Sequence, residues 1–361
     1  MKILTVVGAR PQFIKAAAVG RKLREVGINE VLVHTGQHFD KNMSEVFFHE
    51  MEIPKPHYNL DIHSLSHGAM TGRMMEHIET VLLKERPNGV MIFGDTNSTL
   101  AGALAARKLH IPVIHVEAGL RSFNMDMPEE INRILTDRIS NLLFCPTDAA
   151  IENLQREGYS NFDAKIIKNG DVMQDAALFY TKKAAEFSTI LSTIGLTGKP
   201  FVLATVHRQE NTDNPTLLRS LFSALNEINK ETPVVAPLHP RTLNICKKEG
   251  IVPEFKIIEP VGYFDMVELL KACSLVMTDS GGVQKEAFFF HKNCVTLREQ
   301  TEWVELVEGG YNILTGSNGE KVIAGYREMM SRKNDFSKNL YGGGKASEVV
   351  AQTLLNWSLI Q

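Results

Sequence analysis

Short apolar segments alternate with longer amphipathic segments along most of the chain. Such alternation is typical of buried parallel strands connected by helices. In the first half we expect strands at residues 3–7, 30–34, 89–93, 112–116, 142–145 and 165–167, with helices at 11–26, 71–84, 99–109 and 128–139. A second series of strands is expected at 201–205, 233–237, 255–258, 275–278 and 294–297. The pattern therefore predicts an α/β fold with two Rossmann-like domains.

The length of 361 residues also favours two domains over a single core. We expect an N-terminal domain at residues 1–170 and a C-terminal domain at 171–345, with the helical segment at 176–193 near the boundary. A final helix at 346–361 follows a cluster of three glycines, and we expect it to return to the first domain.

Composition excludes several kinds of partner. The formal net charge is −3 and no block of like charges occurs, so neither a nucleic-acid groove nor an anionic membrane is indicated. The apolar N-terminus is too short for a signal peptide, and no run is long enough to span a bilayer. The four cysteines lack paired spacing. We therefore expect a cytoplasmic protein with no structural zinc.

The segment at 278–282, TDSGG, lies between an apolar strand and a helix. The backbone N–H groups and the positive dipole end of that helix would face an anion above Ser280, Gly281 and Gly282. Glu286 follows within the helix, where its carboxylate could accept from a sugar diol. The pattern predicts a nucleotide phosphate site; the alternative is an ordinary turn into a buried helix.

Chemically capable residues also follow most of the other strands. Because ligands of open α/β sheets bind outside the carboxyl ends of the strands, six such sets indicate one shared active site in an interdomain cleft. The sets comprise residues 8–15, 34–38, 94–98, 117–121, 207–208 and 239–241.

Several cofactors and metals are not indicated. The first turn lacks the G-x-G-x-x-G of dinucleotide folds, and no Walker A loop or H-E-x-x-H motif occurs. The histidines between residues 34 and 67 lack the spacing of metal ligands. We expect neither an added cofactor nor a metal site.

Taken in order, these residues resemble the non-hydrolysing UDP-N-acetylglucosamine 2-epimerases over essentially the whole chain. The resemblance implies two Rossmann-like domains in the GT-B arrangement, a UDP-sugar in the cleft, no redox cofactor and a homodimer. It also implies inversion at C2 by elimination of UDP and its re-addition to the other face of a glycal. The matching motifs are GARP at 8–11 with Lys15, HTGQH at 34–38, GDT at 94–96, HVEAGLR at 115–121, PEEINR at 128–133, HR at 207–208, TDSGG at 278–282 and YGGG at 341–344.

The resemblance implies a role for each motif residue. Asp95, Glu117 and Glu129 would be the carboxylates of the active site, with His207 near the phosphates. Cationic and backbone donors would stabilise the departing diphosphate. The implied substrate-binding residues are Arg10, Lys15, His38, Arg133, His239, Arg241, Ser280, Gly281, Gly282 and Glu286.

Each role has a simpler alternative. Asp95 could cap the helix that starts near Ser98, and Glu129 could merely favour a helix dipole. His207 could be a hydrogen-bonded core histidine, and Arg133 could only pair with Glu130. His239 and Arg241 could belong to a solvated loop. Which carboxylate serves which face of C2 stays open.

Departures from the family's usual sequence bear on the substrate. Gln12 replaces a glutamate, residues 122–127 form a shorter loop, and Thr301-Glu302-Trp303-Val304-Glu305 replaces Thr-Glu-Arg-Pro-Glu. This form is similar to the subgroup that acts on UDP-2,3-diacetamido-2,3-dideoxy-glucuronate for surface polysaccharides such as the lipopolysaccharide O-antigen. A neutral Gln12 would remove a clash with the C6 carboxylate of that sugar.

Other functions remain open at this point. They are a UDP-N-acetylglucosamine 2-epimerase that forms UDP-N-acetylmannosamine, a GT-B glycosyltransferase, a silent nucleotide-sugar binding protein and a hydrolysing epimerase.

Overall fold

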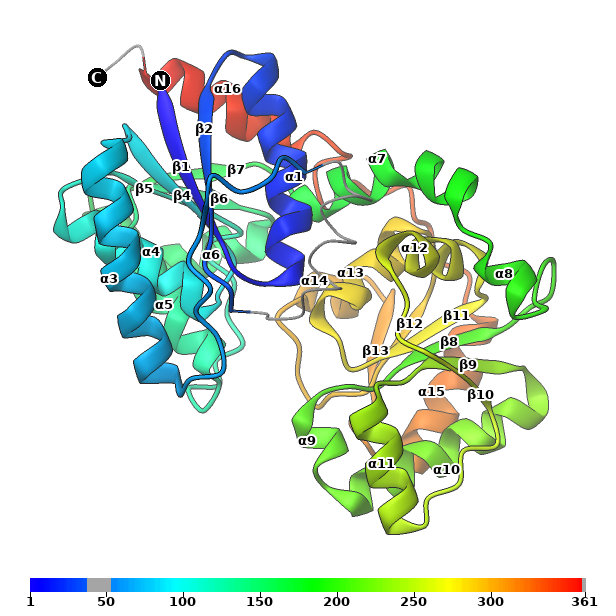
Figure 1. Cartoon of the computed structure of the whole chain (residues 1–361). Helices are drawn as coiled ribbons and strands as arrows, with labels where there is room; N and C mark the ends of the chain where they lie inside the picture. The colour runs from blue at the N-terminus through cyan, green and yellow to red at the C-terminus, as the bar shows by residue number, and fades with distance from the viewer. Residues whose placement is uncertain (38–52, 359–361) are drawn as a thin grey trace. The chain divides into compact units, whose positions relative to one another are not determined.

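A computed structural model describes residues 1–37 and 53–358 of the chain (Figure 1). The chain divides into two compact units, the first made of Met1–Leu178 and Asn339–Gln361 and the second of Phe179–Lys338. Each unit is built around one sheet whose paired strands are all parallel, so the expected fold class of two Rossmann-like domains is confirmed.

The first unit holds a seven-stranded sheet in the order β3-β2-β1-β4-β5-β6-β7. Its strands are β1 (Lys2–Val7), β2 (Asn29–His34), β3 (Tyr58–Asn59), β4 (Gly89–Phe93), β5 (Val113–Val116), β6 (Leu142–Cys145) and β7 (Lys165–Lys168). Its helices are α1 (Arg10–Glu25), α3 (His67–Glu85), α4 (Asn97–Lys108), α5 (Pro128–Ile139), α6 (Asp148–Arg156), the 3-10 helix η1 (Tyr159–Asn161), the start of α7 (Val172–Phe187) and α16 (Ala346–Ser358).

The second unit holds a six-stranded sheet in the order β10-β9-β8-β11-β12-β13. Its strands are β8 (Val202–Thr205), β9 (Val234–Pro237), β10 (Lys256–Ile258), β11 (Leu275–Thr278), β12 (Cys294–Thr296) and β13 (Asn312–Leu314). Its helices are α8 (Ile190–Thr193), α9 (Gln209–Thr212), α10 (Pro215–Glu231), α11 (Pro240–Glu249), α12 (Tyr263–Ala272), α13 (Gly281–Phe289), α14 (Val304–Glu308) and α15 (Gly319–Ser331).

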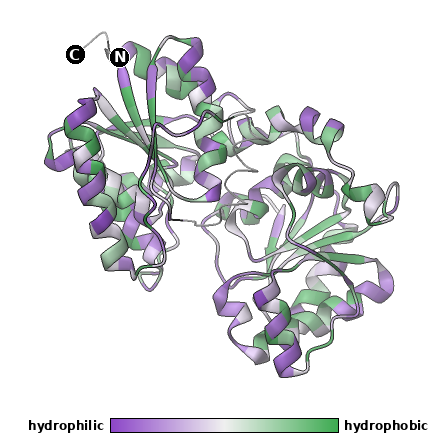
Figure 2. Cartoon of the chain, viewed as in Figure 1, coloured by the Kyte–Doolittle hydropathy of each residue, from purple (hydrophilic) through white to green (hydrophobic). Residues whose placement is uncertain are grey.

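Both sheets are stabilised by apolar side chains on their two faces. In β8, Val202 and Ala204 belong to a cluster that includes residues of α10 and α15, whereas Leu203 belongs to a cluster with residues of α12. Strands buried on both sides read as continuous apolar runs, which is why the sequence shows them so clearly. Figure 2 shows the same distribution, with the strands mainly hydrophobic and the hydrophilic residues on the outer faces of the helices.

The strand order reverses direction once in each unit. In the first unit the reversal lies between β1 and β4, and in the second between β8 and β11. At such a switch point the connections leave in opposite directions and open a crevice at the carboxyl ends of the strands. The fold thus provides one crevice position in each unit.

The division between the units differs from the one expected, which assigned residues 171–178 and 339–345 to the second domain. The segment before α16 is held to the start of α7, because the Asp171 N–H donates to the Tyr341 carbonyl at 2.9 Å. Asp175 also accepts from the N–H groups of Ala346 and Ser347, at 3.1 and 2.6 Å. These bonds place both segments with the first unit, where α16 packs against α1.

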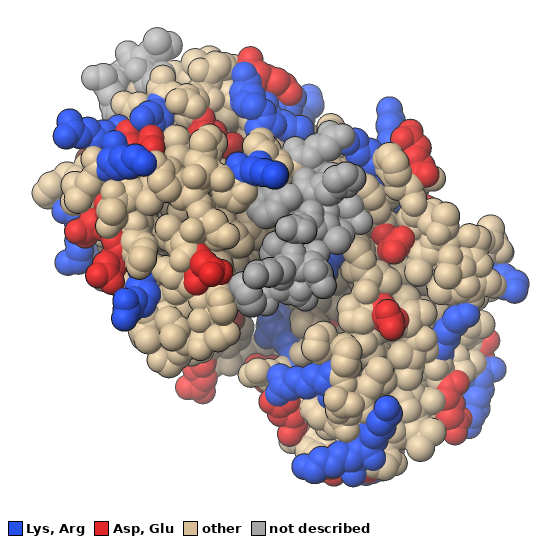
Figure 3. All heavy atoms as spheres, viewed as in Figure 1, with Lys and Arg blue, Asp and Glu red and all other residues tan. Residues whose placement is uncertain are grey.

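The surface carries charges of both signs. On the face shown in Figure 3, basic and acidic side chains are interspersed, in line with the small net charge. Within residues 1–37 and 53–358, no helix is both long and apolar enough to cross a membrane.

Candidate active site

A cavity of about 230 Å³ opens at the switch point of the first unit. Its walls come from the turn after β1 and the start of α1, from the turn after β4, and from the first turns of α5. Lys15, Asp95 and Glu129 line it, so three residues expected from the sequence meet at one place. Glu129 is exposed, as its position in the first turn of α5 allows.

Glu117 lies in a turn at the end of β5 with an unusual backbone. Its φ of 74° is in the left-handed region, which is strained for a residue with a side chain. The N–H groups of Glu117 and Ala118 both donate to the Phe144 carbonyl, at 3.1 and 3.0 Å, and so hold this turn against β6. Strain kept in place by surrounding hydrogen bonds is typical of functional sites.

Lys15 and Glu117 form a buried ion pair. The Lys15 Nζ lies 2.5 Å from Glu117 Oε2, and both side chains are about nine-tenths buried. A Cβ added to Gly94 would lie 3.7 Å from Lys15 Nζ and 3.9 Å from Glu117 Oε1. The turns after β1, β4 and β5 therefore converge, as the parallel sheet requires.

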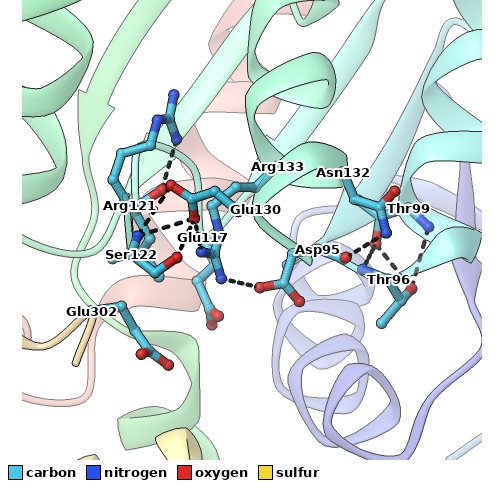
Figure 4. A network of polar contacts seen from close by, with 12 residues as sticks. Asp95, Thr96, Thr99, Glu117, Arg121, Ser122, Glu130, Asn132, Arg133 and Glu302 are labelled. Carbon is cyan, nitrogen blue, oxygen red and sulfur yellow. Dashed lines mark hydrogen bonds and ion pairs between the residues drawn. The ribbon is translucent and has the colours of Figure 1, made fainter. Parts of the chain in front are cut away.

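Arg133 joins Asp95 to Glu130 (Figure 4). One guanidinium nitrogen donates to Asp95 and the other to Glu130, and Asn132 donates to the Asp95 carbonyl at 2.9 Å. Burial would raise the pKa of Glu130, but the Ser122 N–H and the charge of Arg133 bring that pKa below its ordinary value. Arg133 therefore fixes the Asp95 carboxylate at the cavity.

The capping alternative for Asp95 is wrong. Helix α4 is capped by Thr96, whose hydroxyl accepts from the Thr99 N–H at 3.3 Å. Asp95 precedes that cap and directs its carboxylate to Arg133 instead. The helix thus does not account for the acid at this position.

Gln12 is a structural residue that sequence reasoning assigned to substrate selection. Its Oε1 accepts from the N–H groups of Gly8 and Ala9, at 2.8 and 3.0 Å. Its Nε2 donates to the Phe93 carbonyl at 2.7 Å and to the Thr99 hydroxyl at 2.9 Å. The amide thereby fastens the start of α1 to the turn after β4, and it gives no independent indication of the substrate.

His207 and Asp279 meet at the switch point of the second unit. The Asp279 carboxylate is fully buried, and it lies 2.8 Å from His207 Nδ1. It also accepts from the N–H groups of His207 and Arg208, each at 3.0 Å, and from the Asn211 amide at 3.0 Å. Burial would raise the pKa of Asp279, but His207, Asn211 and the Arg208 N–H hold that pKa below its ordinary value.

The His207 ring is therefore oriented by a buried anion. Its side chain is 59% exposed, which rules out the alternative of a core histidine. With Nδ1 bound to the carboxylate, Nε2 is the ring atom left to meet a ligand. A phosphate oxygen is a suitable partner for it.

Ser280, Gly281 and Gly282 begin α13 as expected. The Ser280 hydroxyl caps the helix by accepting from the Val283 N–H at 3.4 Å. A Cβ at Gly281 would lie 2.4 Å from Glu302 Oε1, whereas a Cβ at Gly282 would meet nothing closer than Ser280 Oγ at 4.0 Å. A Cβ at 281 would therefore displace the Glu302 carboxylate, whereas only a ligand close to the backbone would need a glycine at 282.

The remaining expected residues have other surroundings. Glu286 is buried in α13. His239 caps α11 by accepting from the Arg241 N–H at 3.2 Å, and Arg241 binds both oxygens of Asp213, at 2.7 and 2.8 Å. These contacts are those of a solvated loop, the alternative for both residues. Arg10 begins α1, and His38 lies outside the described residues.

No group of three or more His, Cys, Asp or Glu side chains that could hold a metal ion occurs in the part of the chain that the structure describes. All four cysteines of the sequence are free and buried. Burial raises the pKa of the Cys273 and Cys294 thiols to about 12, so neither is a reactive thiolate.

Comparison with known proteins gives consistent results. The sequence model described as UDP-N-acetylglucosamine 2-epimerase matches residues 21–355. The UDP-2,3-diacetamido-2,3-dideoxy-D-glucuronate 2-epimerase of Pseudomonas aeruginosa is 56% identical over 98% of this chain and 99% of its own.

Solved structures are similar over almost the whole length. The Methanocaldococcus jannaschii UDP-GlcNAc 2-epimerase, in complex with UDP-GlcNAc and UDP, has a TM-score of 0.91 and 43% identity over 99% of this chain and 100% of its own. The Neisseria meningitidis UDP-GlcNAc 2-epimerase bound to UDP-GlcNAc has a TM-score of 0.88 and 32% identity over 99% of this chain and 100% of its own.

Proposed function

Because the chain belongs to the UDP-N-acetylglucosamine 2-epimerase family, we propose that it inverts C2 of a UDP-sugar by eliminating UDP and adding it back. The proposed substrate is UDP-2,3-diacetamido-2,3-dideoxy-glucuronate, which would be converted to its manno epimer. The identity of 56% to the Pseudomonas aeruginosa enzyme, over nearly the full length of both chains, is the observation that carries this choice.

The second unit has the features needed to bind the nucleotide diphosphate. The N–H groups at the start of α13 and the exposed backbone at Gly282 suit an anion, and His207 is oriented by Asp279. Because the C1–O bond must ionise before the C2 proton becomes acidic, charge develops on the departing diphosphate. Donors already fixed by folding stabilise that charge without reorganisation.

The first unit has the features needed for the proton transfers. Glu117 and Asp95 come from neighbouring turns, and each carboxylate is fixed by a cation, Lys15 or Arg133. Elimination needs a base at C2, and re-addition on the other face needs an acid that returns the proton. Two carboxylates in fixed positions can supply both steps. Glu129, which lines the same cavity, is the third proposed carboxylate.

A second candidate is the epimerisation of UDP-N-acetylglucosamine to UDP-N-acetylmannosamine. Two similar solved structures contain UDP-GlcNAc, at 43% and 32% identity. The two candidates share the mechanism and differ only at C3 and C6 of the sugar.

Proton NMR in D2O tests the proposal. The protein is incubated separately with each of the two UDP-sugars, and free UDP is measured at equilibrium. We expect deuterium at C2 and growing manno signals with the uronate, and little free UDP. Exchange only with UDP-GlcNAc would favour the second candidate. Accumulating free UDP would indicate a hydrolysing enzyme, and no exchange with either sugar would refute epimerisation.

We further propose that the protein works as a homodimer in the cytoplasm without an added cofactor, in a pathway to a surface polysaccharide such as the O-antigen. The free, buried cysteines fit a reducing compartment. Sedimentation of the purified protein tests the dimer.

A further inference from the structure

A buried cluster of charged side chains lies behind the turns of Asp95 and Glu117. It consists of His115 on β5, Asp137 on α5 and Arg121, which follows the Glu117 turn. His115 and Asp137 have no exposed surface and Arg121 is 3% exposed. None of the three lines the cavity, so they act on its contents only through other residues.

Both ring nitrogens of His115 face oxygen acceptors. Nδ1 lies 2.7 Å from Asp137 Oδ1, and Nε2 lies 2.7 Å from the Gly94 carbonyl oxygen. A neutral imidazole has a single N–H and would leave a lone pair against one of these oxygens. Since the carbonyl cannot donate, both bonds form only if the ring carries two protons or if Asp137 carries one.

The other contacts of Asp137 favour its ionised form. Its carboxylate also accepts from the Gly119 N–H at 3.1 Å and from Arg121 at 2.7 Å. Burial would raise the pKa of Asp137, but the bond from His115 and the charges of His115 and Arg121 keep that pKa below its ordinary value. A ring with two N–H groups donates to both oxygens, so the imidazolium is the form of His115 that satisfies both contacts.

The charges of the cluster then balance. Arg121 binds both oxygens of Glu157, at 2.6 and 2.8 Å, so the cluster holds two cations and two carboxylates. Burial and the nearby Asp137 raise the pKa of the Cys145 thiol and of the Tyr159 hydroxyl, which stay neutral. A neutral His115 would instead leave the fully buried Asp137 to share the charge of Arg121 with Glu157, whose side chain is 34% exposed.

The cluster touches both catalytic turns. His115 binds the carbonyl of Gly94, the residue before Asp95, and Asp137 binds the N–H of Gly119, two residues after Glu117. Both turns contain left-handed backbone, with φ of 63° at Gly94 and 74° at Glu117. Glycine adopts a left-handed φ without steric cost, whereas the left-handed Glu117 is strained and persists only where its surroundings over-determine it.

We propose that His115 and Asp137 are positioning residues, an imidazolium–carboxylate pair that fixes the Asp95 and Glu117 turns relative to each other. This inference rests on the proposed function, in which those two carboxylates handle the C2 proton. A displacement of 1 Å between reacting groups can cost on the order of 100-fold in rate. The pair thus acts on turnover and not on nucleotide binding.

Two substitutions separate the two bonds of His115. In His115→Asn the amide lies near the position of Nδ1, so it can still donate to Asp137 but does not reach the Gly94 carbonyl. In His115→Gln the amide lies near the position of Nε2. It can therefore donate to the Gly94 carbonyl, but Asp137 loses the hydrogen bond that it accepts from the His115 ring. His77→Asn, at an exposed position on α3, is the matched control.

Turnover and binding are then measured together. We expect His115→Asn to lower kcat on the order of 100-fold while KM and the affinity for UDP stay within about twofold of wild type. His115→Gln should recover part of the loss, and His77→Asn should match wild type. A folded His115→Asn protein with wild-type kcat would overturn the positioning role, and so would parallel losses of kcat and UDP affinity.

The ring itself provides a second measurement. In nitrogen-15 spectra of the wild-type protein, both ring nitrogens of His115 should appear as protonated N–H nitrogens at neutral pH. A neutral His115 would overturn the proposal even if His115→Asn does not fold. A wild-type protein inactive on both UDP-sugars would refute the proposed function and the positioning role with it, whereas an active wild type with unaffected variants refutes only the latter.

Discussion

Replacing Gly282 by alanine should separate folding from ligand binding in the second unit. Gly282 is the second residue of α13, is exposed, and has no atom within 4 Å of an added Cβ except Ser280 Oγ at 4.0 Å. Alanine fits this helical backbone, so the substitution should stabilise the protein by about 0.4–1 kcal/mol, chiefly by reducing the freedom of the unfolded chain. The melting temperature should rise by about 1–4 °C.

The same methyl group would keep a diphosphate away from the backbone. The loss of one hydrogen bond to a charged oxygen costs about 1.5–3 kcal/mol. The dissociation constant of UDP should therefore rise roughly 10- to 100-fold. Isothermal titration of UDP and thermal unfolding of the same preparations measure both quantities.

Gly68 offers a matched control. It is also the second residue of a helix, α3, which likewise follows a serine N-cap, and an added Cβ would meet nothing within 4 Å. Gly68→Ala should raise the melting temperature similarly and leave UDP binding unchanged. If Gly282→Ala retained wild-type affinity for UDP, the diphosphate would not lie against this turn, and the assignment of the nucleotide to α13 would fail.

Three further substitutions test the remaining contacts. Glu117→Gln should retain UDP binding and lose most C2 deuterium exchange; wild-type exchange would remove Glu117 from the mechanism. Asp279 has a lowered pKa, so its contribution to stability is complete above the unfolded value, about 3.9, and is lost as pH falls through the lower folded value. In Asp279→Asn the unfolding free energy should decrease less steeply as the pH falls below about 4, and UDP should bind more weakly because His207 loses its partner. An unchanged dependence of the unfolding free energy on acid pH would contradict this. Gln12→Glu places a carboxylate oxygen against the Phe93 carbonyl and should lower the unfolding free energy in urea by about 1–3 kcal/mol, and unaltered stability would show that this bond is dispensable.

Much of the fold could be predicted from the sequence, because parallel strands buried on both faces read as apolar runs. The expected strands at 89–93 and 142–145 coincide with β4 and β6. The edge strands β3 and β13 were not expected, since they have two and three residues and no apolar run marks them. The family was recognised from motifs that follow the strands, and the match over residues 21–355 confirms it.

The partners of the site residues could not be predicted in the same way. Periodicity shows which face of α5 is buried, but it does not show that Arg133 meets Asp95 or that Asp137 meets His115. Those contacts depend on how α5 docks against β5 and against the turn after β4, and they join residues 22 and 38 positions apart in the chain. The sequence placed His115 in the HVEAGLR motif, but nothing in it connected this residue with Asp137.

The structure also changes how substrate preference must be explained. A C6 carboxylate on the sugar would be favoured by added positive charge, yet the loop at 122–127 contains no Lys or Arg, and Trp303 stands where the family usually has an arginine. The Gln12 amide is used within the protein. Within the loop at 122–127, the exposed apolar side chains are Phe123 and Met125. These departures therefore introduce no Lys or Arg, and the proposal of a uronate substrate rests on the 56% identity to the Pseudomonas aeruginosa enzyme.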